Sequence, residues 1–406
     1  MTHRERVLTS LRHQEPDRIP LDLGGSQEST IVAVGYRRLK QHLGLPVDGL
    51  RVDDPCQHTA VVEEDVRRIF DLDVRLVYHE PREWRPGTLP DGSPAEFPAR
   101  FLPERQEDGS QVTRDAAGNV LLRMPAGGCY FDPVYSPLAG ASSIDEIEKH
   151  LGAIESYDTP SYFDKSYEDL GRQAKRLREE TDAFVMGYFG GHIFQAGQSL
   201  RGWDTFLADL LVEPAFAEVL MQRLTDANIA RFGRFAETVG PFVDAVIFED
   251  DLGAQDRPLL APALYRKMVK PHHARLYAFA KSRCPAYLFF HSDGAVAPFI
   301  PDLIEMGIDA LNPVQVSAGG MDTRALKRAF GDAITFWGGG CDSQQVLPFG
   351  TPSDVADEVK RRIDDLAPGG GFVFAPVHNI QSEVPPENIV TMFRTAREYG
   401  VYATSR

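Results

Sequence analysis

The sequence predicts an α/β protein, a closed (β/α)8 barrel of the TIM type with an inserted β-hairpin region. Three observations support this fold class. Short runs rich in β-branched and aromatic residues alternate with longer segments whose apolar residues recur at helical spacing. The short runs are almost continuously apolar, as expected for parallel strands that are buried on both faces. Eight such runs are present, and the first lacks the glycine-rich phosphate fingerprint typical of an open doubly wound sheet.

Two predicted strands lie early in the chain and six lie in its C-terminal half. The early ones are residues 19–24 and 73–79, and the later ones are 183–189, 244–250, 285–292, 308–315, 334–340 and 371–378. Helices are predicted for residues 214–240, 262–282, 295–306, 322–330, 352–366 and 386–399. Because helices separate the later strands, those strands should run parallel to one another.

The segment from residue 81 to residue 142 interrupts this rhythm. It is rich in Pro and Gly, and its turn sequences separate short β-like pieces, with a hairpin predicted at residues 115–123. The segment is too short to bury a core of its own. We therefore expect one domain, residues 1–406, with residues 81–142 inserted over one mouth of the barrel.

Composition excludes several classes of function. The chain has 43 Lys and Arg against 59 Asp and Glu, and a net charge of −16 argues against a nucleic-acid partner. No apolar run approaches the roughly 20 residues of a membrane helix, and the polar start does not resemble a signal peptide. Four cysteines are too few for a disulfide scaffold and form no metal knuckle. We expect a cytoplasmic enzyme with a small-molecule substrate, and a homodimer is compatible with the sequence.

In such a barrel the active site lies at the carboxyl ends of the strands. This rule selects polar residues at or just after the predicted strands. The candidate catalytic residues are Tyr188, His192, Glu249 and Asp251; the candidate substrate-binding residues are Asp22, Gln195, Arg201, Asp250, Asn312, Gln315 and Cys341; and the candidate metal ligands are His291, Asp293 and His378.

The metal prediction depends on residue spacing. His291 and Asp293 are two residues apart, so in an extended chain both side chains point to the same side. His378 ends the last predicted strand. With Glu249 or Asp250, these residues would form a nitrogen and oxygen site suited to zinc, iron or manganese. The alternative is that both histidines are hydrogen-bonded wall residues without a metal.

Three consecutive carboxylates, Glu249, Asp250 and Asp251, end one strand. Like charges this close raise at least one pKa unless a cation or hydrogen bond intervenes. Because side chains alternate, Glu249 and Asp251 should share one face and Asp250 the other. The alternative interpretation is a solvated loop with a helix cap.

Two further candidates have competing interpretations. Arg201 either binds a substrate carboxylate through two parallel hydrogen bonds or stabilises its own loop by pairing with Asp204 or Glu213. Cys341 follows three glycines near a helix start, a position that can lower the pKa of a thiol. The sequence shows no base beside it, so a structural or weak-ligand role is favoured over a nucleophile.

The chain resembles the uroporphyrinogen decarboxylase superfamily, which includes corrinoid-dependent methyltransferases. The resemblance rests on residues 1–23 (MTHRERVLTSLRHQEPDRIPLDL), 249–255 (EDDLGAQ), 291–294 (HSDG), 310–315 (ALNPVQ), 335–340 (TFWGGG) and 369–389 (GGGFVFAPVHNIQSEVPPENI). It spans nearly the whole length and implies a (β/α)8 barrel.

The two branches of the superfamily imply different chemistry. True decarboxylases carry an Arg-Gln-Ala-Gly-Arg run that grips porphyrinogen carboxylates, whereas residues 24–29 here read Gly-Gly-Ser-Gln-Glu-Ser. The methyltransferases bind zinc through a His-x-Cys pair and a later Cys. His291 matches that histidine, while Asp293 and His378 stand at the cysteine positions and replace sulfur by harder ligands.

These observations favour a methyltransferase or demethylase that moves a methyl group between a small methylated or methoxylated substrate and a corrinoid or thiol acceptor. Zinc or another divalent metal would assist, and a separate partner protein would carry the corrinoid. The first alternative is a metal-free decarboxylase or lyase that uses Asp22, Tyr188 and His378 as acid–base groups. The second is a non-catalytic binding module that has kept the barrel.

Overall fold

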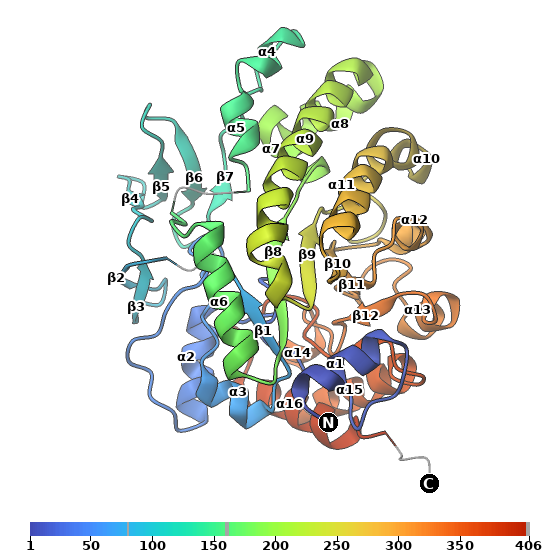
Figure 1. The fold of residues 1–406 in the computed structure, drawn as a ribbon. Helices are drawn as coiled ribbons and strands as arrows, with labels where there is room; N and C mark the ends of the chain where they lie inside the picture. The colour runs from blue at the N-terminus through green and yellow to red at the C-terminus, as the bar shows by residue number, and fades with distance from the viewer. Residues whose placement is uncertain (79–80, 159–161, 403–406) are drawn as a thin grey trace.

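The computed structural model describes residues 1–78, 81–158 and 162–402. Seven parallel strands form one curved sheet that is surrounded by helices (Figure 1). In sheet order the strands are β1 (Val74–Val77), β8 (Phe184–Gly190), β9 (Ala245–Glu249), β10 (Tyr287–His291), β11 (Ala310–Asn312), β12 (Thr335–Trp337) and β13 (Phe372–Val373). The predicted parallel α/β fold is confirmed, although His79, the end of one predicted strand, lies outside the described residues.

The segment predicted as the first strand, residues 19–24, closes the sheet into a barrel. Leu21 forms a parallel bridge with Phe374, and the Phe374 amide donates to the carbonyl oxygen of Pro20 at 2.9 Å. On the other side, the amide of Asp73 donates to the Leu21 carbonyl oxygen at 2.9 Å. The segment makes an isolated bridge in place of the regular strand that was predicted. One reason is that Pro20 has no amide hydrogen to donate.

The strands alternate between two apolar layers. One set of side chains, including Phe184, Met186, Ile247, Phe289 and Trp337, fills the barrel interior. The intervening residues pack against the surrounding helices, as Val185, Val246, Phe248, Leu288 and Phe290 show. This period of two determines which residues at the strand ends face inward.

The helices follow the predicted order. The longer ones are α2 (Ala33–His42), α3 (Glu64–Phe70), α6 (Tyr167–Glu180), α7 (Phe194–Arg201), α8 (Trp203–Val212), α9 (Pro214–Thr238), α11 (Lys270–Arg283), α12 (Ile300–Glu305), α13 (Thr323–Phe330), α15 (Pro352–Leu366) and α16 (Pro386–Tyr399). Short helical segments are α4 (Asp145–Glu148), α5 (Leu151–Glu155), α10 (Pro262–Leu264) and α14 (Val346–Phe349).

Two predicted helices differ from the observed ones. Residues 262–282 contain a π-helical turn at Tyr265–Val269 before α11, because Pro271 lacks the amide hydrogen that a regular α-helix needs there. Residues 295–306 begin with a 3-10 turn at Ala297–Phe299, so α12 is shorter than predicted.

Helix α1 (His3–Leu11) closes the lower end of the barrel in Figure 1. Val7 and Leu11 belong to the interior apolar cluster together with side chains of the strands. The opposite end, where the strands finish, is therefore the open end of the interior.

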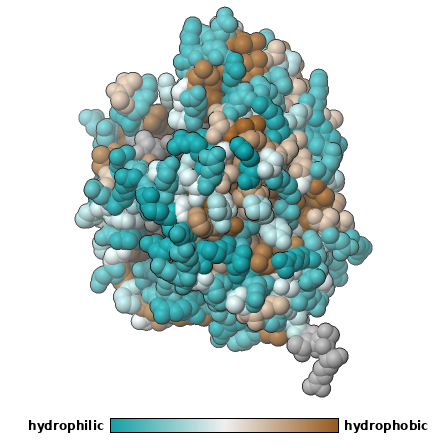
Figure 2. All heavy atoms as spheres, viewed as in Figure 1, coloured by the Kyte–Doolittle hydropathy of each residue, from teal (hydrophilic) through white to brown (hydrophobic). Residues whose placement is uncertain are grey.

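Hydrophilic residues cover most of the face seen in Figure 2, and no described helix combines the length and apolar character needed to cross a bilayer.

Between β1 and α4 the chain forms two small antiparallel sheets. One pairs β2 (Trp84–Thr88) with β3 (Pro94–Pro98). The other joins β4 (Glu104–Arg105), β5 (Gln111–Arg114), β6 (Val120–Met124) and β7 (Asp132–Pro133). Strands β5 and β6 form a hairpin whose turn covers residues 115–119, close to the predicted one. Both sheets lie on one side of the barrel, at the left of Figure 1.

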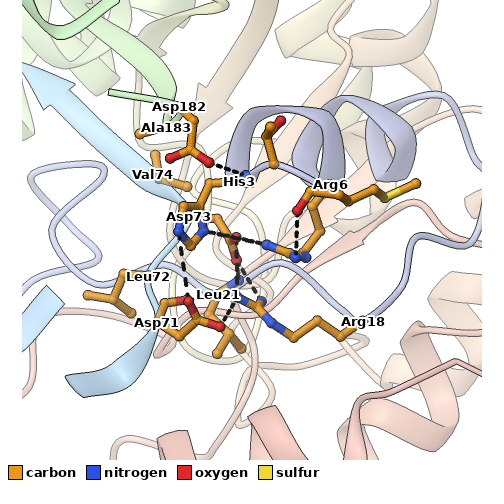
Figure 3. A network of polar contacts seen from close by, with 12 residues as sticks. His3, Arg6, Arg18, Leu21, Asp71, Leu72, Asp73, Val74, Asp182 and Ala183 are labelled. Atoms are coloured by element: carbon orange, nitrogen blue, oxygen red, sulfur yellow. Dashed lines mark hydrogen bonds and ion pairs between the residues drawn. The ribbon is translucent and has the colours of Figure 1, made fainter. Parts of the chain in front are cut away.

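A network of charged side chains fastens the amino-terminal end of the barrel (Figure 3). The carboxylate of Asp73, just before β1, accepts hydrogen bonds from Arg6 at 2.6 Å, Arg18 at 2.7 Å, His3 at 2.7 Å and the Leu21 amide at 2.7 Å. Burial would raise the pKa of Asp73, but these donors outweigh it and lower the pKa. The network ties α1 and the closing segment to β1.

We expect Asp73→Asn to lower the free energy of unfolding by about 3–5 kcal/mol, because it leaves two buried guanidinium groups without their shared anion. Since folding lowers the pKa of Asp73, the wild-type protein should also lose this stabilisation as the pH falls below about 4. Urea denaturation at several pH values measures both effects.

Asp71→Asn is the matched control, because Asp71 also contacts Arg18 but its side chain is 43% exposed. It should cost less than about 1 kcal/mol. Equal losses for the two variants would show that the buried Asp73 network does not hold the barrel together.

Candidate functional site

At the carboxyl ends of the strands, one set of polar side chains points inward in the same alternation as the apolar side chains of the barrel interior. Tyr188, Glu249, His291 and Asn312 each stand two residues after an interior apolar residue of their own strand. The alternation therefore places a phenol, a carboxylate, an imidazole and an amide above the apolar core. They are the inward-facing base of the candidate site.

Three of the predicted residues form a compact group of potential metal ligands. One ligand atom each from His291, Asp293 and His378 lies within 4.8 Å of the others. Asp293 Oδ2 is 3.8 Å from His291 Nε2 and 3.5 Å from His378 Nε2. The two rings come from β10 and from the segment after β13, and their centroids are 6.0 Å apart. These positions can converge on a single ion with a small adjustment.

Asn312 determines which nitrogen of His291 faces this group. Its Nδ2 donates to the Trp337 carbonyl oxygen at 3.0 Å, so its Oδ1 accepts from His291 Nδ1 at 2.7 Å. The lone pair of a neutral His291 is therefore on Nε2, the atom nearest Asp293. Burial would lower the pKa of His291, but the charges of Asp293, Glu249 and Asp251 outweigh it and raise the pKa. The same negative field favours a cation at this position.

A second group joins Glu249 to side chains from other elements. Tyr188 donates to Glu249 Oε2 at 2.9 Å, and His192 Nε2 lies 3.3 Å from the same oxygen. His192 Nδ1 contacts Asp158 Oδ1 at 2.5 Å, and Asp158 is also paired with Arg231. Burial lowers the pKa of His192, but Asp158 and Glu249 outweigh it and raise the pKa well above its usual range. The two carboxylates therefore favour the protonated form of His192, which lies between them.

Glu28 brings a second carboxyl group to Glu249. Burial and the charge of Glu249 raise the pKa of Glu28 well above its usual range. Burial would also raise the pKa of Glu249, but His192 and His291 outweigh it and lower the pKa. These opposite shifts favour the protonated form of Glu28 and the ionised form of Glu249. Oε2 of Glu28 and Oε1 of Glu249 are buried and make no hydrogen bond to any described residue.

Asp251 fixes the backbone that carries two of the three potential metal ligands. Its Oδ1 accepts a hydrogen bond from the amide of Asp293 at 2.9 Å, which fixes the backbone between His291 and Asp293. Burial and the charge of Asp293 raise the pKa of Asp251. As predicted from alternation, Asp250 points to the other face of the strand.

Asp250 holds the start of α7 and has no free oxygen for a substrate. Its carboxylate accepts from the amides of Ile193, Phe194 and Gln195 at 2.6–2.9 Å and contacts His273 Nε2 at 2.8 Å. The predicted substrate-binding role is therefore replaced by a helix-capping one. The described contact of Gln195 is the hydrogen bond that its backbone amide donates to Asp250 in this cap.

Arg201 and Cys341 also lie outside the cluster. Arg201 is buried, pairs with Asp209 at 2.7 Å and donates to the carbonyl oxygens of Leu138 and Ala141. It braces its loop, but through Asp209, which was not among the predicted partners. Cys341 is fully buried, and burial raises the pKa of its thiol, as expected for the structural role that was favoured over a nucleophile.

Gln315 and Asp22 shape the walls. Gln315 accepts from the Gly294 amide at 2.8 Å and donates to Gln255, which secures the loop after β10. Asp22 is buried and accepts from Trp337 Nε1 at 2.8 Å and from Ser29 at 2.9 Å. Burial raises the pKa of Asp22 to about 6.

Sequence reasoning missed Glu28 and Asp158. Glu28 lies in the loop after the first predicted strand, so the strand-end rule that selected Asp22 could have found it. Asp158 lies in the connection between α5 and α6, away from any strand end. No sequence signal links it to His192.

Comparison with known proteins gives the family. The uroporphyrinogen decarboxylase (URO-D) model matches residues 137–399, more than half of the chain. A uroporphyrinogen decarboxylase of Methylococcus capsulatus is 23% identical over 207 residues, which cover 50% of this chain and 55% of that protein, so the match spans about half of the relative's length. The solved structure of a methyltransferase from Methanosarcina mazei has the same fold, with a TM-score of 0.57, 15% identity and coverage of 98% and 99% of the two chains. The chain belongs to the uroporphyrinogen decarboxylase family.

Proposed function

We propose that the protein is a methyltransferase or demethylase that moves a methyl group from a small methylated or methoxylated substrate to a corrinoid or thiol acceptor. The observation that carries the proposal is the convergence of His291, Asp293 and His378, with His291 Nε2 aimed at the group. Membership of the family and the shared fold with a methyltransferase support it.

The residues present fit a divalent metal ion, zinc or another. Two imidazoles and one carboxylate supply nitrogen and oxygen donors, and such a set leaves a position open for a substrate atom. Asn312 orients His291 in the manner of the outer partners that surround metal-bound histidines. When bound, such an ion would polarise the methyl-bearing oxygen or convert a thiol to a thiolate.

The paired carboxyl groups supply the acid–base chemistry. Glu28 holds a proton, while Tyr188 and the cationic His192 keep Glu249 ionised. An ether loses its methyl group poorly because an alkoxide is a poor leaving group, so a proton delivered to the oxygen lowers the barrier. In this proposal Glu28 is the general acid, a role that was considered for Glu249 from the sequence. Glu249 is the neighbouring anion that stabilises the protonated form of Glu28.

The charge of the site favours a neutral substrate. The carboxyl groups of Glu249, Asp251 and Asp293 lie at the site, and Asp158 and Glu249 already balance the charge of His192. A porphyrinogen with many carboxylates would need several cationic partners. This balance weighs against decarboxylation of such a substrate.

The proposed corrinoid acceptor is carried by a separate protein. The competing function is a metal-free decarboxylase or lyase. In that case the buried carboxyl group of Asp22, whose pKa is about 6, would act as an acid–base group. Turnover that depends on an added corrinoid supports methyl transfer. Release of CO2 without a corrinoid supports the competing function.

We expect about one divalent ion per chain in protein purified without chelators, and less than about 0.2 in His291→Ala and His378→Ala. Metal analysis by mass spectrometry, followed by zinc titration of the apoprotein, measures this. His42→Ala, on the exposed end of α2, is the control and should keep its metal. A wild-type chain with less than about 0.2 ion that also fails to bind added zinc would remove the metal from the proposal.

We expect Asn312→Ala to keep all three ligands but to weaken zinc binding about 10- to 100-fold, because His291 loses the partner that fixes its ring. Competition with a chromophoric chelator gives the affinity. Unchanged affinity would mean that Asn312 does not orient a ligand.

We expect Glu28→Gln to lower kcat about 100-fold or more while leaving the metal content unchanged, because the variant keeps the shape but cannot deliver the proton. The assay follows the absorbance of cob(I)alamin with a panel of methoxylated aromatic compounds. Glu83→Gln, an exposed glutamate of the inserted region, should retain full activity. Wild-type activity in Glu28→Gln would exclude Glu28 as the acid.

A further inference from the structure

A cavity of about 530 Å3 lies between the two small antiparallel sheets, outside the cluster described above. Its walls come from β2 and β3 on one side and from β4, β5 and β6 on the other, with His58 contributed by the segment before α3. Phe97, Phe101 and Phe131 give it an aromatic lining. A volume of this size accommodates a small organic molecule.

Arg85 places an unbalanced positive charge in this cavity. Its guanidinium group donates to the Phe101 carbonyl oxygen at 2.6 and 3.0 Å and lies 5.6 Å from the centre of the Phe97 ring. No carboxylate of the described residues pairs with it. Burial lowers the pKa of Arg85, as expected for a charge that has lost water without gaining an anion. Carbonyl oxygens fix the guanidinium group but leave its charge uncompensated.

The other ionic residue of the cavity lining is also positively charged. Arg105 also lines the cavity, and no ion pair of its side chain occurs in the described part of the chain. None of the described lining residues is Asp or Glu, although the whole chain carries a net charge of −16. His58 donates from Nδ1 to the Cys129 carbonyl oxygen, which leaves Nε2 as an acceptor. The lining itself therefore carries two positive charges and no negative one, which favours an anionic occupant.

The cavity is connected to the metal-ligand group through two neighbouring residues. Asn379, next to His378, donates to the side chain of Gln57 at 2.9 Å, and Gln57 precedes His58. Asn379 also accepts from the amide of Thr30. One short series of contacts therefore links His58 in the cavity wall to the residue that follows His378.

We propose that the inserted sheets form a binding site for a small organic anion with a flat apolar body, such as an aromatic carboxylate. The aromatic rings would stack on the apolar body, and the second hydrogens of the two Nη atoms of Arg85, which also donate to the carbonyl oxygens of Phe101 and Pro86, would be donated to the carboxylate. Arg105 would add a second positive charge at the rim, and His58 would accept a hydrogen bond from a hydroxyl group of the ligand. The site is separate from the metal ligands and does not depend on the proposed methyl transfer.

Isothermal titration of the full chain with 1-naphthoate tests the proposal, and 1-naphthalenemethanol serves as a neutral probe of the same shape. We expect saturable binding of the anion that is at least about tenfold tighter than binding of the alcohol and that weakens with added salt. Arg85→Gln should weaken naphthoate binding about tenfold or more, and Arg105→Gln should weaken it several-fold. Because Arg105 is exposed, its variant is informative even if Arg85→Gln does not fold.

Arg123→Gln is the matched control. Arg123 lies on β6 of the same inserted region, but it pairs with Asp108 and does not line the cavity. Its variant should bind naphthoate within about twofold of the wild-type protein. The proposal would be overturned by the absence of saturable binding up to about 5 mM, by equal affinity for acid and alcohol, or by equal losses in Arg105→Gln and Arg123→Gln.

Discussion

The buried carboxylate of Asp73 is the constraint on which the closed barrel depends. The segment that joins the two edges of the sheet makes few backbone hydrogen bonds, so Asp73 adds an acceptor for Leu21 and anchors Arg6 and Arg18 beside it. The same arrangement recurs at the start of later strands. Asp244 accepts from the amide of Val185 and Asp309 accepts from that of Leu288. Only a closed ring brings the far ends of distant strands to one place.

At that place the pKa values of two neighbouring carboxyl groups move in opposite directions. Donors from His192 and Tyr188 favour the ionised form of Glu249, and Glu28 favours its proton because it faces that charge in a buried position. Asp158 stands behind His192 and raises the pKa of its ring, and Arg231 pairs with Asp158 in turn. The division of charge therefore depends on residues that lie well outside the shell around the reacting groups.

The sequence was sufficient to predict the barrel and to place Tyr188, Glu249, His291 and Asn312 at inward-facing strand ends, because both follow from the alternation of side chains along apolar strands. The wider strand-end rule also selected Arg201 and Cys341, which lie outside the cluster. The same alternation separated Asp250 from Glu249, and the structure shows Asp250 on the helix side. The rule could not reveal that Glu28 meets Glu249 or that Asp158 meets His192, since loops far apart in the chain make these contacts. Pro271 could have indicated the π-helical turn, but the buried Asp209 that pairs with Arg201 could not be found from spacing.

The first helix fills the barrel from below, with Val7 and Leu11 among the interior side chains. The interior is packed with apolar side chains, so no route passes through it from end to end. A reactant can reach the side chains at the strand ends only from the open end of the barrel, and a bulky one bound there would obstruct the approach of another. If the proposed corrinoid carrier docks at that end, the small molecule would have to bind before it, and the order of addition would be fixed.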